Sequence, residues 1–343
     1  MKISSTLSIV AIACALVACG GGGGGGNDTP SNGGSVPETP KENFPVNIVP
    51  SSYADKNRAD IYDFTNKNRT MCGFNSVKQR AELDESAGRH AKYLQVNKTL
   101  GHVEYAGNPD YYAATLSERI AKAGFETMGA IEIASAVSGG TLFAGAGGFS
   151  ADEPSGLDNI KQLFATVYHL QGALGEHSDM GIGFSISENI SAVPGTTNFY
   201  SAAVVNFGTP QGSQPVAYAG SDVRTFPCEG VADVAPAFIG ESPSPFPARD
   251  FNAAPMGMPI YVAAPAQQKI ALSSYKVTSS GSSVQAQTLT SSNDPQRLVK
   301  ENEVFIVPDA PLQSNTAYQV EITGTVNGKH FAKSFSYRTG TQY

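Results

Sequence analysis

Three acid–base side chains stand out in the sequence because, if brought together, they could hold a ligand. They are His102 in LGHVEY, Glu132 in AIEIAS and His169 in VYHLQGAL. Two imidazoles and one carboxylate that meet in a groove can bind a divalent metal ion such as Zn²⁺, or the polar head of a small ligand. Since 30 and 37 residues separate them, no short metal-binding motif links them, and only the fold can assemble the site.

Each of these residues also has a purely structural interpretation. His102 follows a predicted helix and could be an exposed loop residue. Glu132 lies in the apolar stretch MGAIEIASAV, where a carboxylate needs a partner; either histidine or Arg119 could be that partner. His169 lies near the end of another predicted helix, where a cation is favoured by the helix dipole.

The remaining histidines have weaker signals. His90 falls on the apolar face of a predicted helix, which is typical of a core residue with its hydrogen bonds satisfied. His177, in GEHSDMG, is either an auxiliary ligand near His169 or a solvated turn residue. His330 belongs to a separate C-terminal segment.

Hydrophobic periodicity predicts four helices and then extended segments. We expect helices over residues 55–71, 81–96, 108–124 and 156–170. Strands are expected over residues 180–187, 197–208 and 215–220. Helices followed by antiparallel strands predict an α+β fold rather than a doubly wound parallel sheet.

The motifs TNKNRTMCGF, ELDESAGRHAKYLQVNKTLGHVE, SERIAKAGFETMGAIEIA and YHLQGALGEHSDMGIGF follow one another in order. This order resembles the bacterial branch of the CAP superfamily (cysteine-rich secretory proteins, antigen 5 and pathogenesis-related proteins; the SCP domain) over roughly Tyr53 to Cys228. The resemblance implies an α-β-α sandwich. It also implies that His102, Glu132 and His169 share one groove.

The chain departs from the family pattern at two of these positions. The Gly-Glu-Asn motif is Ile131-Glu132-Ile133 here, and Leu170 replaces the Arg that often follows the second histidine. The family has a second acid in the groove, for which Glu104 is the nearest candidate. These departures favour binding over turnover.

The N-terminus is typical of a lipoprotein. Lys2, an apolar run and LVAC predict a signal peptide over residues 1–18, with Cys19 lipidated. A transmembrane anchor is the rival interpretation, but the apolar run is shorter than the ~20 residues a span needs. Residues 19–44 are rich in Gly and Pro and are expected to be a flexible tether. We expect an exported protein held to the outer membrane by the lipid on Cys19.

The rest of the chain is long enough for two domains. We expect a CAP/SCP-like domain over residues 45–230, a Pro-rich linker over 231–252 and an all-β domain over 253–343. With Cys14 removed and Cys19 lipidated, Cys72 and Cys228 are the pair left, and an exported protein is expected to join them in a disulfide.

The sequence of the C-terminal segment predicts a small β-sandwich. Six stretches have the composition of strands: 259–265, 269–278, 284–290, 303–308, 318–326 and 330–340. Asn327-Gly328 supplies the positive φ angles of a tight hairpin. We predict an immunoglobulin-like module that acts as a spacer or an adhesion module.

Charge and motifs exclude some functions and leave others open. A formal net charge of −7 disfavours nucleic acid as a partner, and no esterase, zincin or phosphate-loop motif occurs. We expect a non-catalytic groove that binds a divalent metal through His102 and His169, or a small amphiphilic ligand. The alternatives are a metal-dependent hydrolase or peptidase with Glu132 or Glu104 as base, and a structural or adhesive surface protein. The ligand, protein partners and oligomeric state are not specified by the sequence.

Overall fold

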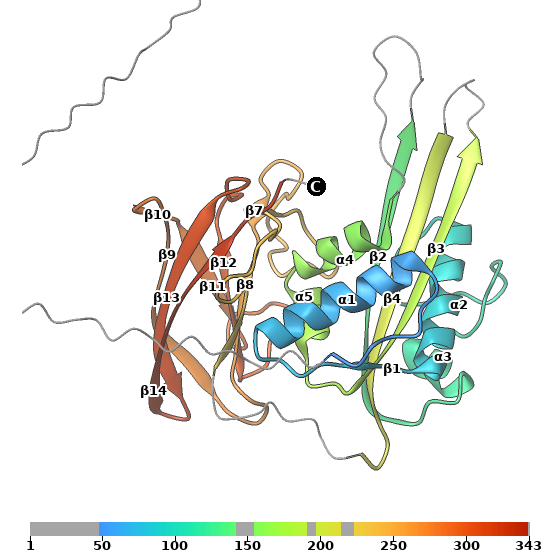
Figure 1. Cartoon of the computed structure of the whole chain (residues 1–343), viewed down its shortest axis with the longest axis horizontal. Coiled ribbons are helices and arrows are strands. Elements are labelled where there is room, and N and C mark those ends of the chain that lie inside the picture. Colours follow the sequence, from blue (N-terminus) through green and yellow to red (C-terminus); the bar gives the residue numbers. More distant parts are fainter. Residues whose placement is uncertain (1–47, 142–153, 191–196, 214–222, 342–343) are drawn as a thin grey trace, which may run out of the picture. The chain divides into compact units, whose positions relative to one another are not determined.

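The computed structural model describes residues 48–141, 154–190, 197–213 and 223–341 (Figure 1). Over these ranges the chain is α+β, with a helix-and-sheet region first and antiparallel sheets after it. The predicted signal peptide, the tether and the strand expected at 215–220 lie outside the described residues. Within the described ranges, no helix is both long and apolar enough to cross a membrane.

The N-terminal region is built on a four-stranded sheet with the strand order β1-β3-β4-β2. The strands are β1 (Lys78–Gln79), β2 (Thr127–Thr141), β3 (Asp179–Ile190) and β4 (Thr197–Pro210). β1 runs parallel to β3, and the other pairs are antiparallel. β2 is therefore an edge strand, which residues from helices on both faces of the sheet can reach.

Helices cover both faces of this sheet (Figure 1). On one side lie α2 (Ala81–Asn97) and α3 (Leu116–Lys122); on the other lie α1 (Lys56–Met71), α4 (Gly156–Phe164) and α5 (Tyr168–Leu174). α2 packs so tightly on β3 that a Cβ atom on Gly181 or Gly183 would collide with its backbone. These two glycines therefore set the position of α2, which carries His90.

Two of the predicted helices differ in the structure. The third begins only at Leu116, because Thr115 and Glu118 form a capping box there, while Asp110 has a positive φ of 56°. The fourth, expected to be continuous over 156–170, is interrupted between α4 and α5. The amides of Val167 and Tyr168 donate to the Glu241 carboxylate, so a distant side chain takes their hydrogen bonds and a new helix starts.

The six predicted C-terminal strands are all present. They are β8 (Ile260–Ala263), β9 (Ile270–Ser279), β11 (Ala286–Thr290), β12 (Glu303–Pro308), β13 (Ala317–Val326) and β14 (Lys329–Arg338). With β5 (Arg224–Phe226) and β10 (Ser282–Ser283), they form two four-stranded sheets, β10-β9-β13-β14 and β11-β12-β8-β5. Asn327 and Gly328 both have positive φ, as the predicted hairpin requires. The immunoglobulin-like assignment stays a prediction.

The two regions share one continuous hydrophobic core in the described chain. β5 lies within the range predicted for the first domain, yet it pairs with β8 of the second. The predicted linker contains β6 (Ala237–Phe238), which pairs with β7 (Met256–Gly257), and Phe238 is fully buried. The segment between the regions is thus packed structure, and it delivers a side chain to the site described below.

The predicted disulfide between Cys72 and Cys228 is present, with Cα atoms 5.4 Å apart. It joins the end of α1 to the chain just after β5. Because it spans 156 residues, the loss of chain entropy in the unfolded state can stabilise the fold by at most about 5 kcal/mol. The disulfide thus links the end of α1 to the chain next to β5, a strand that pairs with β8 of the second region.

Candidate functional site

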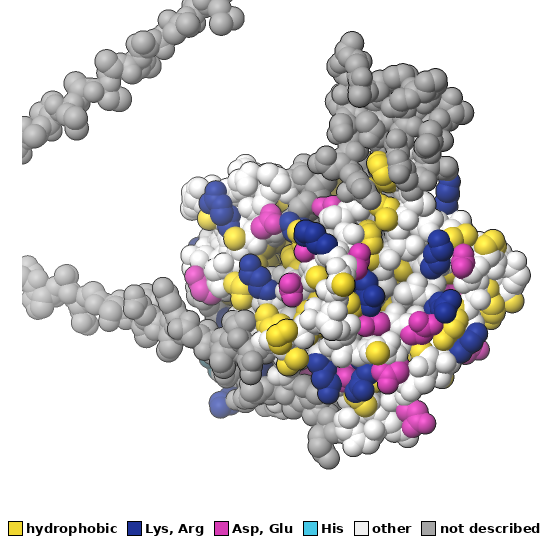
Figure 2. Space-filling model, turned by 45° about the vertical axis from the view of Figure 1, so that its right-hand side comes forward, with side chains coloured by type: hydrophobic (Ala, Val, Ile, Leu, Met, Phe, Trp, Pro, Cys, Tyr) yellow, Lys and Arg dark blue, Asp and Glu magenta, His cyan; other side chains and the backbone are white. Residues whose placement is uncertain are grey.

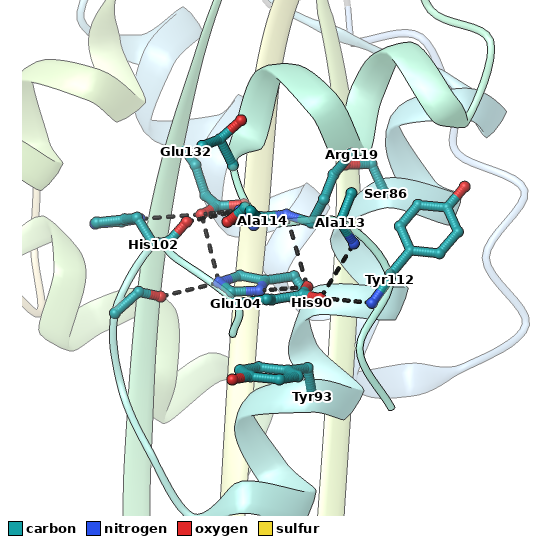
Figure 3. Close-up of polar contacts among 12 residues, drawn as sticks. Ser86, His90, Tyr93, His102, Glu104, Tyr112, Ala113, Ala114, Arg119 and Glu132 are labelled. Carbon is teal, nitrogen blue, oxygen red and sulfur yellow. Dashed lines mark hydrogen bonds and ion pairs between the residues drawn. The ribbon is translucent and has the colours of Figure 1, made fainter. Parts of the chain in front are cut away.

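A fully buried histidine on α2 is the centre of an ionic cluster (Figure 3). His90 Nδ1 lies 2.9 Å from Glu104 Oε1. Its Nε2 lies 2.9 Å from the Gly101 carbonyl oxygen and 3.6 Å from Glu132 Oε1. Both ring nitrogens therefore face oxygen atoms, one of a carboxylate and one of a backbone carbonyl. Tyr93 stacks almost parallel to this ring, with centroids 6.1 Å apart.

Arg119 of α3 brings a guanidinium to the cluster, and its side chain is also fully buried. Its Nη2 donates to both Glu132 oxygens, at 2.8 and 2.9 Å, and to the His102 carbonyl at 3.1 Å. Its Nε lies 3.9 Å from Glu104 Oε1. Arg119 thus bridges the two carboxylates and also holds the backbone of the loop that carries His102.

Glu104 completes the cluster. Its second oxygen accepts from the amides of Tyr112 (2.6 Å) and Ala113 (3.3 Å). We call His90, Glu104, Arg119 and Glu132 the sealed cluster: two carboxylates face the His90 ring and the Arg119 guanidinium, and each of the four side chains is at most 2% exposed. Buried charges persist only when they are paired and hydrogen-bonded in this way.

The electrostatics of Glu132 argue against a role as a general base. Burial raises the pKa of its carboxyl, but the hydrogen bond from His102 and the nearby His90 and Arg119 outweigh burial and lower that pKa below its ordinary value. An efficient base at neutral pH has a pKa near 7. Glu132 is therefore a fixed carboxylate that orients its neighbours.

His102 lies at the edge of the sealed cluster and reaches solvent, with 44% of its side chain exposed. Its Nδ1 is 3.0 Å from Glu132 Oε1. Because a carboxylate oxygen can only accept, Nδ1 carries the proton and Nε2 is left with a free lone pair when the ring is neutral.

His169 of α5 has the same arrangement with a different carboxylate. Its Nδ1 lies 3.0 Å from Glu241 Oε2 and 3.0 Å from Thr166 Oγ1, and its side chain is 14% exposed. The His102 and His169 rings face each other with centroids 6.4 Å apart, tilted by 35°. We call these two histidines the open pair. No hydrogen bond to either Nε2 comes from the part of the chain that the structure describes.

Two solved structures align with part of this chain. An extracellular protein containing an SCP domain from Bacillus anthracis str. Ames aligns with 18% identity and a TM-score of 0.31, over 45% of this chain and 40% of that one. An outer surface protein of Borrelia burgdorferi aligns with 14% identity and a TM-score of 0.31, over 46% of this chain and 96% of that one. No protein-family model and no curated protein matches the chain. A likeness at this level assigns no function, so the function has to be argued from the side chains.

The structure brings the three residues singled out in the sequence to one place, and the partners of Glu132 include both Arg119 and His102. Glu104 has a different place from the one expected: it pairs with His90 inside the sealed cluster, where all its contacts are internal. The second acid next to the open pair is Glu241. Sequence reasoning missed it, although an acidic residue between the apolar PAFIG and a proline-rich run was a signal.

The surroundings of His177 differ from both expectations, an auxiliary ligand near His169 and a solvated turn residue. It is partly buried and stacks on Phe207, with centroids 5.8 Å apart. Burial, followed by the nearby cations Arg69 and Lys300, lowers the pKa of its ring to about 3. It is a neutral packing residue rather than a solvated turn residue.

The fit of the open pair to a metal ion can be tested on its geometry. With N–metal bonds of about 2.1 Å and roughly 1.2 Å more to each ring centre, two imidazoles on one tetrahedral ion have centroids about 5.4 Å apart, and about 6.6 Å is reached only when the two nitrogens and the ion lie in line. The observed 6.4 Å is longer than the tetrahedral separation, so the two rings would have to approach each other to share an ion. Among the described residues, no group of three His, Cys, Asp or Glu side chains could hold an ion. A shared ion would therefore have two protein nitrogens as ligands.

Proposed function

We propose that the chain is an exported, lipid-anchored CAP/SCP-like protein whose open pair binds a divalent cation such as Zn²⁺ reversibly and without turnover. The observation that carries the proposal is that Nδ1 of both His102 and His169 is hydrogen-bonded to a carboxylate, while the two rings face each other. Carboxylate–histidine pairs of this kind orient the ring and raise the basicity of the other nitrogen toward a metal.

Two nitrogens leave the remaining coordination positions to water or to an external ligand. A bound ion would supply a cationic contact for such a ligand and would link the loop after α2 to α5. A hydrolytic site would in addition need a free general base. Glu104 and Glu132 are held by His90 and Arg119, which supports binding over hydrolysis.

A small amphiphile is the second candidate ligand, and one observation favours it. Three large apolar side chains next to His102 are exposed: Leu100 at 56%, Val103 at 46% and Tyr105 at 68%. They could contact an apolar tail while the head meets the open pair. Titration with a short-chain detergent monomer would oppose this candidate if His102→Ala and wild type bound it equally.

The proposed anchor is the lipid on Cys19, and LVAC behind an apolar run supports it. Lys/Arg and Asp/Glu side chains alternate over the face shown in Figure 2, which supports anchoring by lipid rather than by a basic patch. If Cys19→Ser leaves the protein in the membrane fraction, this anchor is wrong.

Zn²⁺ titration against a competing chelator tests the proposed function. We expect the full chain to bind one ion, and His102→Ala and His169→Ala each to bind it at least about tenfold more weakly, a loss of about 1.4 kcal/mol. His330→Ala, which removes an exposed histidine on β14, is the matched control and should bind as wild type does. Equal affinity in all four proteins would refute the proposal.

A further inference from the structure

The second carboxylate of the open pair comes from outside the helix-and-sheet region. Glu241 lies in the segment between the two regions, 72 residues after His169 in the sequence, and its side chain is only 1% exposed. A carboxylate buried to this degree needs several hydrogen bonds to offset its desolvation. Its contacts show what it holds in place.

Glu241 makes contacts at both of its oxygens. Oε1 accepts from the amides of Val167 at 2.7 Å and Tyr168 at 3.1 Å, so it caps the start of α5. Oε2 lies 3.0 Å from the Tyr168 amide and 3.0 Å from His169 Nδ1. One carboxylate therefore fixes both the beginning of the helix and the ring of the residue that follows.

The neighbour of His169 on the other side makes the direction of this hydrogen bond clear. The Thr166 hydroxyl donates its hydrogen to the Leu163 carbonyl at 2.9 Å, so toward His169 Nδ1 its oxygen acts as an acceptor. Nδ1 thus faces two acceptors and must carry the proton. The free lone pair is on Nε2, the nitrogen available to a ligand.

The C-terminal region holds the rest of α5. The Tyr168 hydroxyl donates to Asp294 at 2.5 Å, and Gln171 Nε2 donates to Glu303 at 2.5 Å and to the Leu298 carbonyl at 2.9 Å. Burial and the Asp294 hydrogen bond raise the pKa of Tyr168, so its hydroxyl stays a donor. Side chains on two turns of α5 therefore attach to the loop before β12 and to β12 itself.

From these contacts we infer that Glu241 is the positioning residue for His169, and that the C-terminal region is a component of the ligand site rather than a spacer. Glu241 fixes the tautomer of His169 and leaves its Nε2 as the nitrogen available to a ligand. The inference rests on the proposed function only in naming the ligand as a divalent cation. The tautomer itself is a property of the metal-free protein.

Nitrogen-15 NMR of histidine-labelled, metal-free full chain tests the inference. In wild type, at a pH where the ring is neutral, we expect His169 to be protonated on Nδ1. In Glu241→Gln, the side-chain oxygen can still accept from Val167 and Tyr168, but the amide NH₂ then faces Nδ1. The proton should move to Nε2 while the helix cap and the fold are retained.

The Zn²⁺ affinity of the same variant gives the second measurement. Glu241→Gln should bind Zn²⁺ about 10- to 100-fold more weakly, the usual effect of losing a carboxylate that orients a metal-binding histidine. Glu301→Gln is the matched control, since Glu301 is an exposed carboxylate of the C-terminal region. It should change neither the tautomer nor the affinity.

The outcomes distinguish the positioning role of Glu241 from Zn²⁺ binding by the open pair. Protonation of His169 on Nε2 in wild type, or on Nδ1 in Glu241→Gln, would overturn the inference, because Glu241 would then be a helix cap only. A tautomer that switches as expected, in a wild-type protein that binds no Zn²⁺, would support the positioning role and refute the proposed function.

Discussion

The sealed cluster and the open pair both place histidine against carboxylate and lie next to each other, but their histidines differ in how many ring nitrogens have a partner. In the sealed cluster, both nitrogens of His90 face acceptors and Arg119 bridges Glu104 and Glu132. In the open pair, each histidine has a carboxylate on Nδ1 alone. Glu132 belongs to both contact sets, since it pairs with Arg119 and also orients His102.

The difference shows that the number of satisfied contacts, rather than residue type, separates a structural group from a binding group. A charge buried without its partner costs several kcal/mol, so a cluster of paired charges resists change. A histidine with one free nitrogen costs little because water can reach that atom. The comparison predicts large stability effects inside the cluster and small ones at the open pair.

Arg119→Met should have the largest effect. It removes the guanidinium that faces two buried carboxylates and leaves them with only their histidine and backbone partners, and breaking a buried ion pair in this way typically costs about 3–5 kcal/mol. Urea denaturation measures this as a lower unfolding midpoint. Lys67→Met, at an exposed position of α1, is the control and should change stability by less than about 0.5 kcal/mol. If both variants lost the same small amount, the cluster would not be a structural element.

His177 sharpens the comparison because burial, and after it two nearby cations rather than carboxylates, govern the pKa of its ring. The pKa of its ring is about 3 in the fold against 6.5 in an unfolded chain, so the unfolded state binds the proton first as pH falls. Stability contributed by the neutral ring is complete above pH 6.5 and is lost progressively toward pH 3. Between pH 7 and 5 the loss should be about 2 kcal/mol.

Denaturation of wild type and His177→Gln across that pH range checks this expectation. The free energy of unfolding should fall less steeply with decreasing pH in the variant, while the exposed His330→Gln should follow wild type. Parallel curves for wild type and His177→Gln would mean that His177 is protonated in the fold and that cations do not control it.

The smallest stability effect is expected for His102→Ala. Its ring is 44% exposed and contacts Glu132, which keeps its two hydrogen bonds to Arg119. The free energy of unfolding should change by no more than about 0.5 kcal/mol in a thermal or urea melt. A loss close to that of Arg119→Met would place His102 inside the sealed cluster and remove the distinction.

Local patterns predicted much of the fold. Periodicity located the first two helices and the six C-terminal strands, and cysteine counting gave the disulfide. Patterns failed in two places, once where a distant residue decides and once where two local signals compete. The break before α5 depends on Glu241, which no helical periodicity near residue 165 reveals. The third helix began late because the capping box at Thr115 is stronger than the Asn-Pro-Asp signal seven residues earlier.

The residues of the candidate site likewise divide into those that local sequence signals could identify and those that only tertiary packing reveals. His102, Glu132 and His169 could be named from motif order, and Arg119 from the need of a carboxylate in an apolar strand. His90 was expected to be a satisfied core residue, and its buried ring has hydrogen bonds at both nitrogens. Its role as a bridge between two carboxylates could not be read from helix spacing. Glu241 could not be assigned, because only tertiary packing brings it next to His169.

Anomalous scattering at the zinc edge, from crystals of the full chain soaked in Zn²⁺, tests the central claim most directly. We predict one peak between His102 and His169, about 2.1 Å from each Nε2. The sealed cluster should show none, since its carboxylates are already paired. A peak at Glu104 or Glu132, or no peak between the two histidines, would contradict the division into a sealed cluster and an open pair.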